Sequence, residues 1–280
     1  MDNGQRRTAA EFSRKLIAWQ RRHGRHDLPW QRSRDPYRVW LADIMLQQTQ
    51  VATVVPYYRR FLGRFPDVSS LAQAQLGEVL RHWAGLGYYS RARNLHRTAI
   101  AVLGQHGGDF PAERAALEAL HGIGRSTAAA IAVFSFGTRE AILDGNVKRV
   151  LARYFAVAGY PGEKSVEKRL WLLAESLLPA RAIEHYTQAL MDLGATVCTR
   201  ASPGCVQCPV RASCAALGEG RVWAYPASRP GKKLPLRTVA MLLVIRRGKV
   251  LLERRPPAGI WGGLWSLPEL PAHADVSAHC

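Results

Sequence analysis

Long apolar runs are absent from this 280-residue chain, although 48% of its residues are hydrophobic. No stretch approaches the ~20 consecutive apolar residues that a membrane-spanning helix needs. Residues 1–10 also lack the apolar core of a secretion signal. The sequence therefore predicts a globular protein of the cytoplasm or the nucleus, and we expect it to have no membrane partner.

Acidic residues are scarce, with 21 Asp and Glu against 39 Lys and Arg, and the formal net charge is +18. Such an excess of cations is far more than solubility requires and indicates a polyanionic partner. Nucleic acid is favoured over an anionic membrane surface. In a bacterium, we expect the protein to associate with the nucleoid.

Cysteine is also rare, but four of the five cysteines fall in one window with the spacing C-x6-C-x2-C-x5-C, namely Cys198, Cys205, Cys208 and Cys214. In a reducing cytoplasm, such a group indicates metal ligation and not disulfides. Four thiolates suit either a tetrahedral zinc ion or a [4Fe–4S] cluster. Zinc sites usually pair two C-x2-C knuckles, and only one is present, so the spacing favours iron–sulfur and leaves zinc as the alternative.

Apolar residues recur at helical spacing from the N-terminus to about Leu193, which predicts a mainly α region. Asp35-Pro36, for example, supplies an N-cap and a first-turn proline for one helix. The chain then divides into a helical part over residues 1–224, which includes the cysteine loop at 198–214, a proline-rich basic linker at 225–236, and a β-like part at 237–280.

The last part carries two apolar runs, at residues 239–245 and 250–252, around an Arg247-Gly248 turn. This pattern predicts a β-hairpin. Because so short a segment is less than a β domain normally needs, we expect it to be the start of a larger domain.

Two glycines, Gly122 and Gly124, separate two helical patterns and are followed by Arg125. This arrangement predicts a helix–hairpin–helix, in which the glycines let the backbone approach a phosphate and the next helix directs its amides at the anion. A plain helix–helix turn is the alternative. Further on, Asp144 stands at a helix entrance, where an N-cap is its ordinary role.

The hairpin, Asp144 and the cysteine loop, in this order, resemble the helix–hairpin–helix DNA glycosylase superfamily that carries a [4Fe–4S] cluster. Four further segments are similar to the adenine DNA glycosylases of the MutY type within it: Leu28-Pro29-Trp30, the Met-Leu-Gln-Gln-Thr-Gln-Val run at 45–51, Gly-Leu-Gly-Tyr-Tyr-Ser-Arg-Ala-Arg-Asn-Leu at 85–95, and Met-Asp-Leu-Gly-Ala at 191–195. The resemblance covers about residues 19–268.

This resemblance implies two helical lobes with a DNA cleft between them and one [4Fe–4S] cluster on the four cysteines. It implies a monomer that binds double-stranded DNA with A:8-oxoguanine or A:G mispairs and hydrolyses the N-glycosidic bond of the adenine. The segment at 237–268 is similar to the start of the family's Nudix-like domain, without the glutamates of a Nudix catalytic box.

The chemistry needs two carboxyls with opposed roles, because adenine leaves only after a ring nitrogen is protonated and the sugar then develops positive charge. The resemblance assigns the sugar-side carboxylate to Asp144 and the acid to Asp43. The family has a glutamate at the acid position, so the carboxyl here is one C–C bond, ~1.5 Å, shorter. Unless burial raises its pKa, an aspartate would also be ionised at neutral pH.

The remaining roles also follow from the resemblance. Ser126 stands where a lyase carries its Schiff-base lysine, so base excision without strand cleavage is expected, and Asn146 would support Asp144. Gln48 and Tyr88 would wedge into the DNA stack as the adenine flips out. The adenine pocket would be shaped by Leu28, Trp30, Val51, Gln188 and Met191. The alternatives are a catalytically impaired mismatch-binding homologue and an endonuclease III-like glycosylase/lyase.

Overall fold

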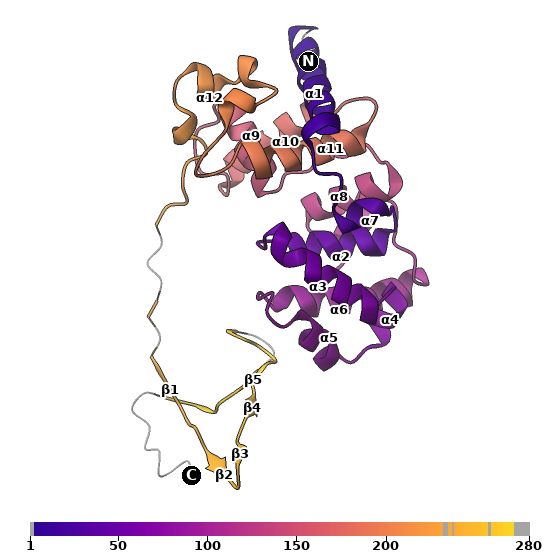
Figure 1. Cartoon of the computed structure of the whole chain (residues 1–280), viewed down its shortest axis with the longest axis vertical. Coiled ribbons are helices and arrows are strands. Elements are labelled where there is room, and N and C mark those ends of the chain that lie inside the picture. Colours follow the sequence, from indigo (N-terminus) through magenta and orange to yellow (C-terminus); the bar gives the residue numbers. More distant parts are fainter. Residues whose placement is uncertain (1–2, 232–234, 237, 257–258, 272–280) are drawn as a thin grey trace. The chain divides into compact units, whose positions relative to one another are not determined.

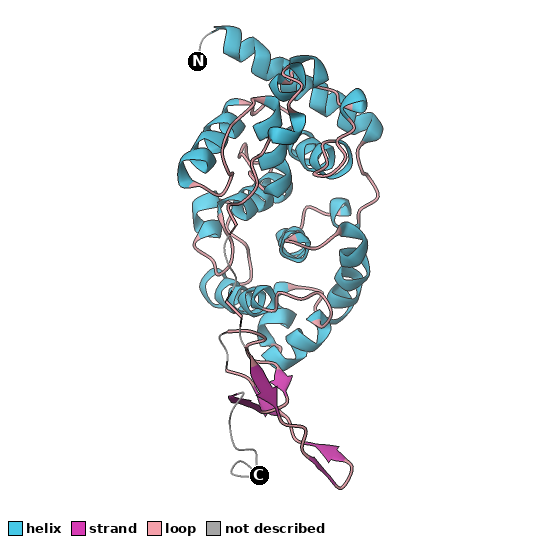
Figure 2. Ribbon diagram, turned by 90° about the vertical axis from the view of Figure 1, so that its left-hand side faces the viewer, coloured by secondary structure: helices cyan, strands magenta, loops and turns pink. Residues whose placement is uncertain are grey.

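The computed structural model describes residues 3–231, 235–236, 238–256 and 259–271, and it divides the chain into two compact units, Met1–Pro230 and Gly231–Cys280. Within the described residues, the first unit is helical and the strands lie in the second (Figures 1 and 2). No helix of the described part is both long and apolar enough to cross a membrane.

The middle of the first unit forms one helical lobe. Its elements are α2 (Pro36–Leu46), α3 (Val51–Arg64), α4 (Val68–Gln73), α5 (Leu76–Trp83), α6 (Ser90–His106), α7 (Arg114–Glu118) and α8 (Arg125–Phe136). Helix α2 packs on both α8 and α6, and α4 packs on α6. The predicted start of α2 is confirmed, because Asp35 Oδ1 accepts a hydrogen bond of 2.9 Å from the backbone N–H of Tyr37.

The other lobe is built from both ends of the unit. It combines α1 (Asn3–His23) with α9 (Gly145–Tyr154), α10 (Lys164–Ser176), α11 (Ile183–Asp192), the π-helical turn Leu193–Val197 and α12 (Ala215–Gly218). Short 3-10 turns lie at Pro29–Arg32, between α1 and α2, and at Cys205–Gln207, Arg211–Ser213 and Val222–Ala224. The two-lobed helical fold expected from the sequence is therefore present.

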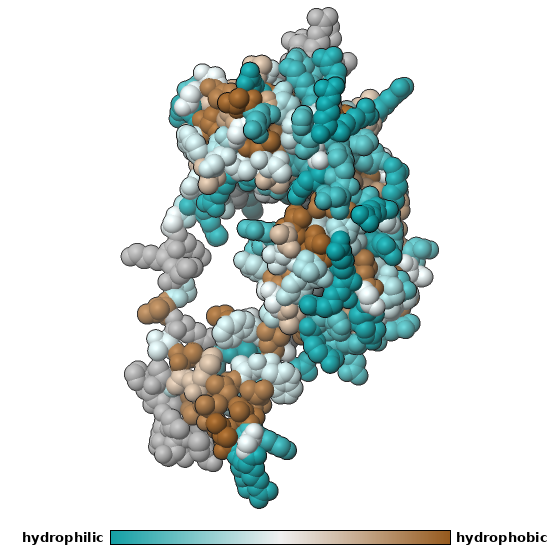
Figure 3. Space-filling model, viewed as in Figure 1, coloured by the Kyte–Doolittle hydropathy of each residue, from teal (hydrophilic) through white to brown (hydrophobic). Residues whose placement is uncertain are grey.

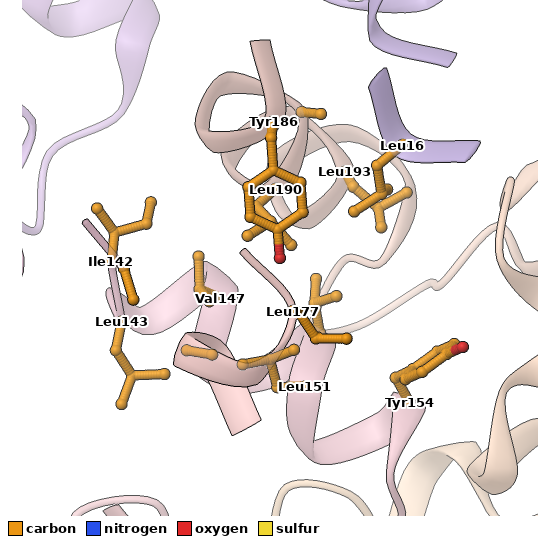
Figure 4. Close-up of a cluster of buried hydrophobic side chains, with 14 of the residues drawn as sticks. Leu16, Ile142, Leu143, Val147, Leu151, Tyr154, Leu177, Tyr186, Leu190 and Leu193 are labelled. Atoms are coloured by element: carbon orange, nitrogen blue, oxygen red, sulfur yellow. The ribbon is translucent and has the colours of Figure 1, made fainter. Parts of the chain in front are cut away.

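The core of this second lobe explains why α1 belongs to it. Phe12 and Leu16, one helical turn apart, are fully buried against residues of α9 and α11. The Phe12 ring lies 4.6 Å from that of Tyr154, and Figure 4 shows Leu16 beside Leu193 in the same cluster. Each such side chain contributes about 1.5–3 kcal/mol when it is fully buried.

The described residues of the second unit form six short strands: β1 (Val239–Met241), β2 (Ile245–Arg246), β3 (Lys249–Val250), β4 (Glu253–Arg254), β5 (Trp265–Ser266) and β6 (Glu269–Pro271). The predicted hairpin is correct at its tip, where Ile245 pairs with Val250. It is wrong for the start of the first run, because β1 pairs with β6 instead. Residues 272–280 of the predicted β part lie outside the described residues.

Many apolar side chains of the second unit are exposed, including Leu243, Leu251, Ile260 and Trp265. Figure 3 shows this brown surface over the strands, in contrast to the mostly hydrophilic surface of α1 and its neighbours. The described strands form three separate two-stranded ladders. A ladder of two strands has too little surface to bury the apolar side chains on its faces.

Candidate active site

A cavity of about 360 Å³ in the first unit brings together the residues predicted to bind a base. Its wall is formed by the segment around the turn Pro29–Arg32, by α2 and by α11, so both lobes contribute. The predicted pocket residues Leu28, Trp30, Val51, Gln188 and Met191 all line it, as does Asp43. Its volume lies in the range of small-ligand pockets.

Asp43 projects into this cavity from the last turn of α2. The pKa of its carboxyl is raised to about 6, mainly because the group is buried; a hydrogen bond from the side chain of Thr127 opposes this rise, and the charge of Asp144 adds to it. The Thr127 hydroxyl also accepts a hydrogen bond of 3.3 Å from Gln47 Nε2, which leaves its proton free for Asp43. At neutral pH a minority of the Asp43 carboxyls, on the order of a tenth, is therefore protonated, which is far more than for an exposed aspartate.

Asp144 is the N-cap of α9, where its Oδ1 accepts a hydrogen bond of 2.7 Å from the backbone N–H of Val147. Burial raises the pKa of the Asp144 carboxyl, while the backbone N–H groups of Val147 and Asn146 and the cations Arg149 and Lys148 hold it down. Asp144 is not among the residues that line the cavity. Its influence on the pKa of Asp43 nevertheless places the two carboxyls within electrostatic reach of each other.

The two supporting residues hold the backbone around Asp144. Ser126 Oγ accepts a hydrogen bond of 2.9 Å from the backbone N–H of Leu143, directly before the cap. Asn146 Oδ1 accepts one of 2.7 Å from Arg149 Nη2. A Cβ added at Gly194 would lie 2.6 Å from that of Asn146, so the π-helical turn packs directly against the start of α9.

The two predicted wedge residues lie on turns with unusual backbone geometry. Gln48 follows α2 with a φ of 57°, and Tyr88 precedes α6 with a φ of 47°. Both side chains are exposed, Tyr88 to 59%. These two turns are therefore placed to present an amide and an aromatic ring outward.

The hairpin residues differ from one another. Gly122 has a φ of 74°, and a Cβ there would lie 2.8 Å from Asn94 Cβ, so this position requires glycine. Gly124 is the N-cap of α8 and has open space around it. The Arg125 guanidinium is engaged within the protein, because it pairs with Glu175 and lies 3.9 Å from the centre of the Trp171 ring.

The four cysteines of the loop line one cavity of about 30 Å³. Beside it, the buried Arg153 donates a hydrogen bond of 3.4 Å to Cys198 Sγ and others to the carbonyls of Thr199 and Tyr225. In the part of the chain that the structure describes, no three His, Cys, Asp or Glu side chains are grouped as ligands of a single metal ion. Four sulfurs around one cavity suit a polynuclear cluster, in which each thiolate binds its own iron.

Sequence reasoning missed a buried acid next to the cavity. Asp192, at the end of α11, is fully buried, and its carboxylate accepts hydrogen bonds from Gln188 Nε2 at 2.9 Å and from Arg25 Nε at 2.7 Å. Asp192 lies in the Met-Asp-Leu-Gly-Ala segment at 191–195, but nothing in that segment distinguishes it from an acid on the surface. Its place on the apolar side of α11 is the signal that could have found it.

Residues 41–176 match the model of the HhH-GPD superfamily of base excision DNA repair proteins, and residues 240–280 match that of a NUDIX domain. The fold and these matches thus define a base-excision DNA repair enzyme of the helix–hairpin–helix class.

The curated proteins that this chain resembles indicate which family within this class it belongs to. The chain is 38% identical to the adenine DNA glycosylase of Buchnera aphidicola subsp. Baizongia pistaciae, over 96% of this chain and 76% of the relative. It is 42% identical to that of Rattus norvegicus, over 92% of this chain and 60% of the relative. A thermostable thymine-DNA glycosylase structure superposes with a TM-score of 0.69 at 29% identity, over 78% of this chain and 98% of that one. The chain belongs to the adenine DNA glycosylase family and is a DNA glycosylase, a hydrolase of N-glycosyl bonds.

Proposed function

We propose that this protein removes adenine from double-stranded DNA in which the adenine is mispaired with 8-oxoguanine or guanine, acting as a monomer in the cytoplasm. The observation that carries the proposal is the cavity in which the predicted pocket residues gather around Asp43. The product would be an abasic site in an uncut strand. A lyase step has no support at position 126, because Ser126 offers a hydroxyl and not an amine.

The cavity wall supports the choice of adenine. A carboxylate only accepts hydrogen bonds, so Asp192 obliges Gln188 to turn its Nε2 group toward it. Gln188 lines the cavity, and its Oε1 atom would then be the acceptor that it offers to a base there. It complements the amino group of adenine, whereas guanine presents a carbonyl oxygen at the same position of its ring.

The two carboxyls divide the reaction between them. Asp43, whose pKa burial raises to about 6, donates its proton to a ring nitrogen of the flipped adenine when it is in its protonated form, and so turns the base into a leaving group. Asp144, with two backbone N–H groups and two cations near it, supplies the negative charge that stabilises the sugar as the bond breaks. Gln48 and Tyr88 would fill the space that the adenine leaves in the stack.

A single-turnover assay tests the proposal. Duplexes carrying A:8-oxoguanine, A:G, A:T or C:8-oxoguanine are mixed with excess protein, and free adenine and alkali-labile sites are quantified. We expect adenine release from the first two duplexes and no cleavage without alkali. Tight binding to the A:8-oxoguanine duplex without any adenine release would support the second candidate, a mismatch-binding homologue impaired by Asp43.

The reaction should slow as the pH rises. The acid acts in its protonated form, and with a pKa of about 6 that form of Asp43 declines about tenfold per pH unit above this value. The single-turnover rate should therefore fall toward a slope of −1 in log rate against pH between about pH 7 and 8. Asp43→Asn should show no such slope. A wild-type rate that is flat across this window would contradict the assignment.

For the cysteine loop, we propose one [4Fe–4S] cluster on Cys198, Cys205, Cys208 and Cys214, which would fold the loop beside the DNA. Cys205→Ser should lower iron and sulfide content, bleach the visible absorption and weaken DNA binding, because one thiolate is lost. Cys280→Ser, outside the quartet, is the matched control. Stoichiometric zinc without sulfide in anaerobically purified protein would contradict the proposal.

A further inference from the structure

The turns that carry Gln48 and Tyr88 need an explanation for their shape. Left-handed backbone is unfavourable for residues with a side chain, by roughly 1–2 kcal/mol each. Both residues nevertheless adopt it, with φ values of 57° and 47°. Contacts elsewhere in the protein must therefore hold the two turns in this conformation.

Arg91 makes those contacts. It lies in the first turn of α6, only 9% of its surface is exposed, and its guanidinium reaches acceptors on both turns. Nη1 donates to the carbonyls of Ile44, Met45 and Gln47 at 2.9, 2.9 and 2.5 Å, and Nη2 donates to Thr49 Oγ1 and to the carbonyls of Leu86 and Gly87 at 3.1, 3.3 and 3.4 Å. All these acceptors belong to residues 44–49 or 86–87, which flank Gln48 and Tyr88.

Because Arg91 carries a buried charge, it depends on the acceptors that the two turns supply. Within the described residues, no carboxylate forms an ion pair with it, so the cation depends on backbone carbonyls and one hydroxyl. Its Nε is buried without an acceptor, and its guanidinium carbon lies 5.5 Å from the centre of the Tyr88 ring. Moving either turn would leave a buried charge without its partners, which is costly.

We propose that Arg91 is a positioning residue that joins the two turns and fixes the separation and direction of Gln48 and Tyr88, so that both enter the DNA stack together. This inference rests on the proposed function, since it concerns how the adenine is unstacked. A lysine at this position keeps the charge, but its single ammonium cannot reproduce the planar fork that contacts both turns.

The test compares Arg91→Lys with wild type on an A:8-oxoguanine duplex that carries 2-aminopurine next to the target adenine. Fluorescence of 2-aminopurine rises when its neighbour leaves the stack, so its amplitude reports wedging separately from bond cleavage. We expect the amplitude to fall severalfold and the single-turnover rate to fall by about a hundredfold, the scale of a misplacement near 1 Å. Affinity for undamaged duplex should remain within about threefold, because the phosphate contacts persist.

Two further variants keep the test decisive. Arg97→Lys, on an exposed position of the same helix, is the matched control and should behave as wild type. Thr49→Val removes one acceptor without changing side-chain size and should move both readouts in the same direction by a smaller factor. It decides the question if circular dichroism shows that Arg91→Lys does not fold.

Each result has a defined meaning. Folded variants with wild-type fluorescence amplitude would overturn the inference, whatever their rates, because the wedge would then be intact without Arg91. If wild type raises the fluorescence but releases no adenine, the proposed excision fails. In that case a reduced amplitude in Arg91→Lys still supports the positioning role.

Discussion

Asp144→Asn is expected to lower the single-turnover rate of adenine release by about a thousandfold or more while it leaves DNA binding unchanged. The carboxylate charge that stabilises the developing sugar cation is lost. Removing a group that stabilises transition-state charge lowers the rate by about two to three orders of magnitude or more. The fold should survive, because asparagine is as good an N-cap as aspartate and its Oδ1 can still accept from Val147.

A matched control is available in Asp67, the N-cap of α4, whose Oδ1 accepts a hydrogen bond of 2.7 Å from the backbone N–H of Ser70. Asp67→Asn makes the same chemical change at the start of a helix that does not line the cavity, and it should excise adenine at the wild-type rate. Binding is measured by fluorescence anisotropy with the A:8-oxoguanine duplex. An Asp144→Asn variant that retains more than a tenth of the wild-type rate would remove this residue from the mechanism.

Asp43→Glu should raise the single-turnover rate markedly, by on the order of tenfold to a hundredfold, and Asp43→Asn should nearly abolish it. The present carboxyl is one C–C bond shorter than that of a glutamate, which misplaces the proton donor on a scale of ~1 Å, and a misplacement of that size costs up to about a hundredfold in rate. The cavity of about 360 Å³ offers room for the extra methylene. Asparagine cannot donate a comparable proton, although it can still accept the hydrogen bond from Thr127.

Both Asp43 variants should melt within a few degrees of wild type, since the position faces a cavity and not packed core. The informative comparison is between the two rates. If neither Asp43→Glu nor Asp43→Asn changes the single-turnover rate, position 43 is not the acid, and another group must protonate the base.

Local features of this protein were predictable from sequence because their causes are local. The Asp35 cap, the apolar stripe of Phe12 and Leu16, and the turn between Ile245 and Val250 each depend on residues a few positions apart. The pocket residues were predicted by resemblance and not by periodicity. Their gathering around one cavity depends on segments that the sequence separates by more than a hundred residues.

The parts that sequence reasoning missed depend on distant partners. The pairing of β1 with β6 joins residues about thirty positions apart, which a hairpin signal cannot anticipate. The ion pair of Arg125 with Glu175 joins residues fifty positions apart, which no local pattern anticipates. The burial of Arg91 follows from carbonyls on α2 and its turn, and an arginine in a basic chain gives no sign of this in the sequence.

The construction of the second lobe from α1 and α11 has a consequence for how the chain is made. Arg25, just after α1, and its partner Asp192 are 167 residues apart. At a synthesis rate of about 5–20 residues per second, α1 would leave the ribosome roughly ten to thirty seconds before α11. Until α9 and then α11 have been made, Phe12 and Leu16 lack the partners that bury them in the folded protein. The nascent N-terminus is therefore a segment on which a chaperone that binds apolar helices would be expected to act.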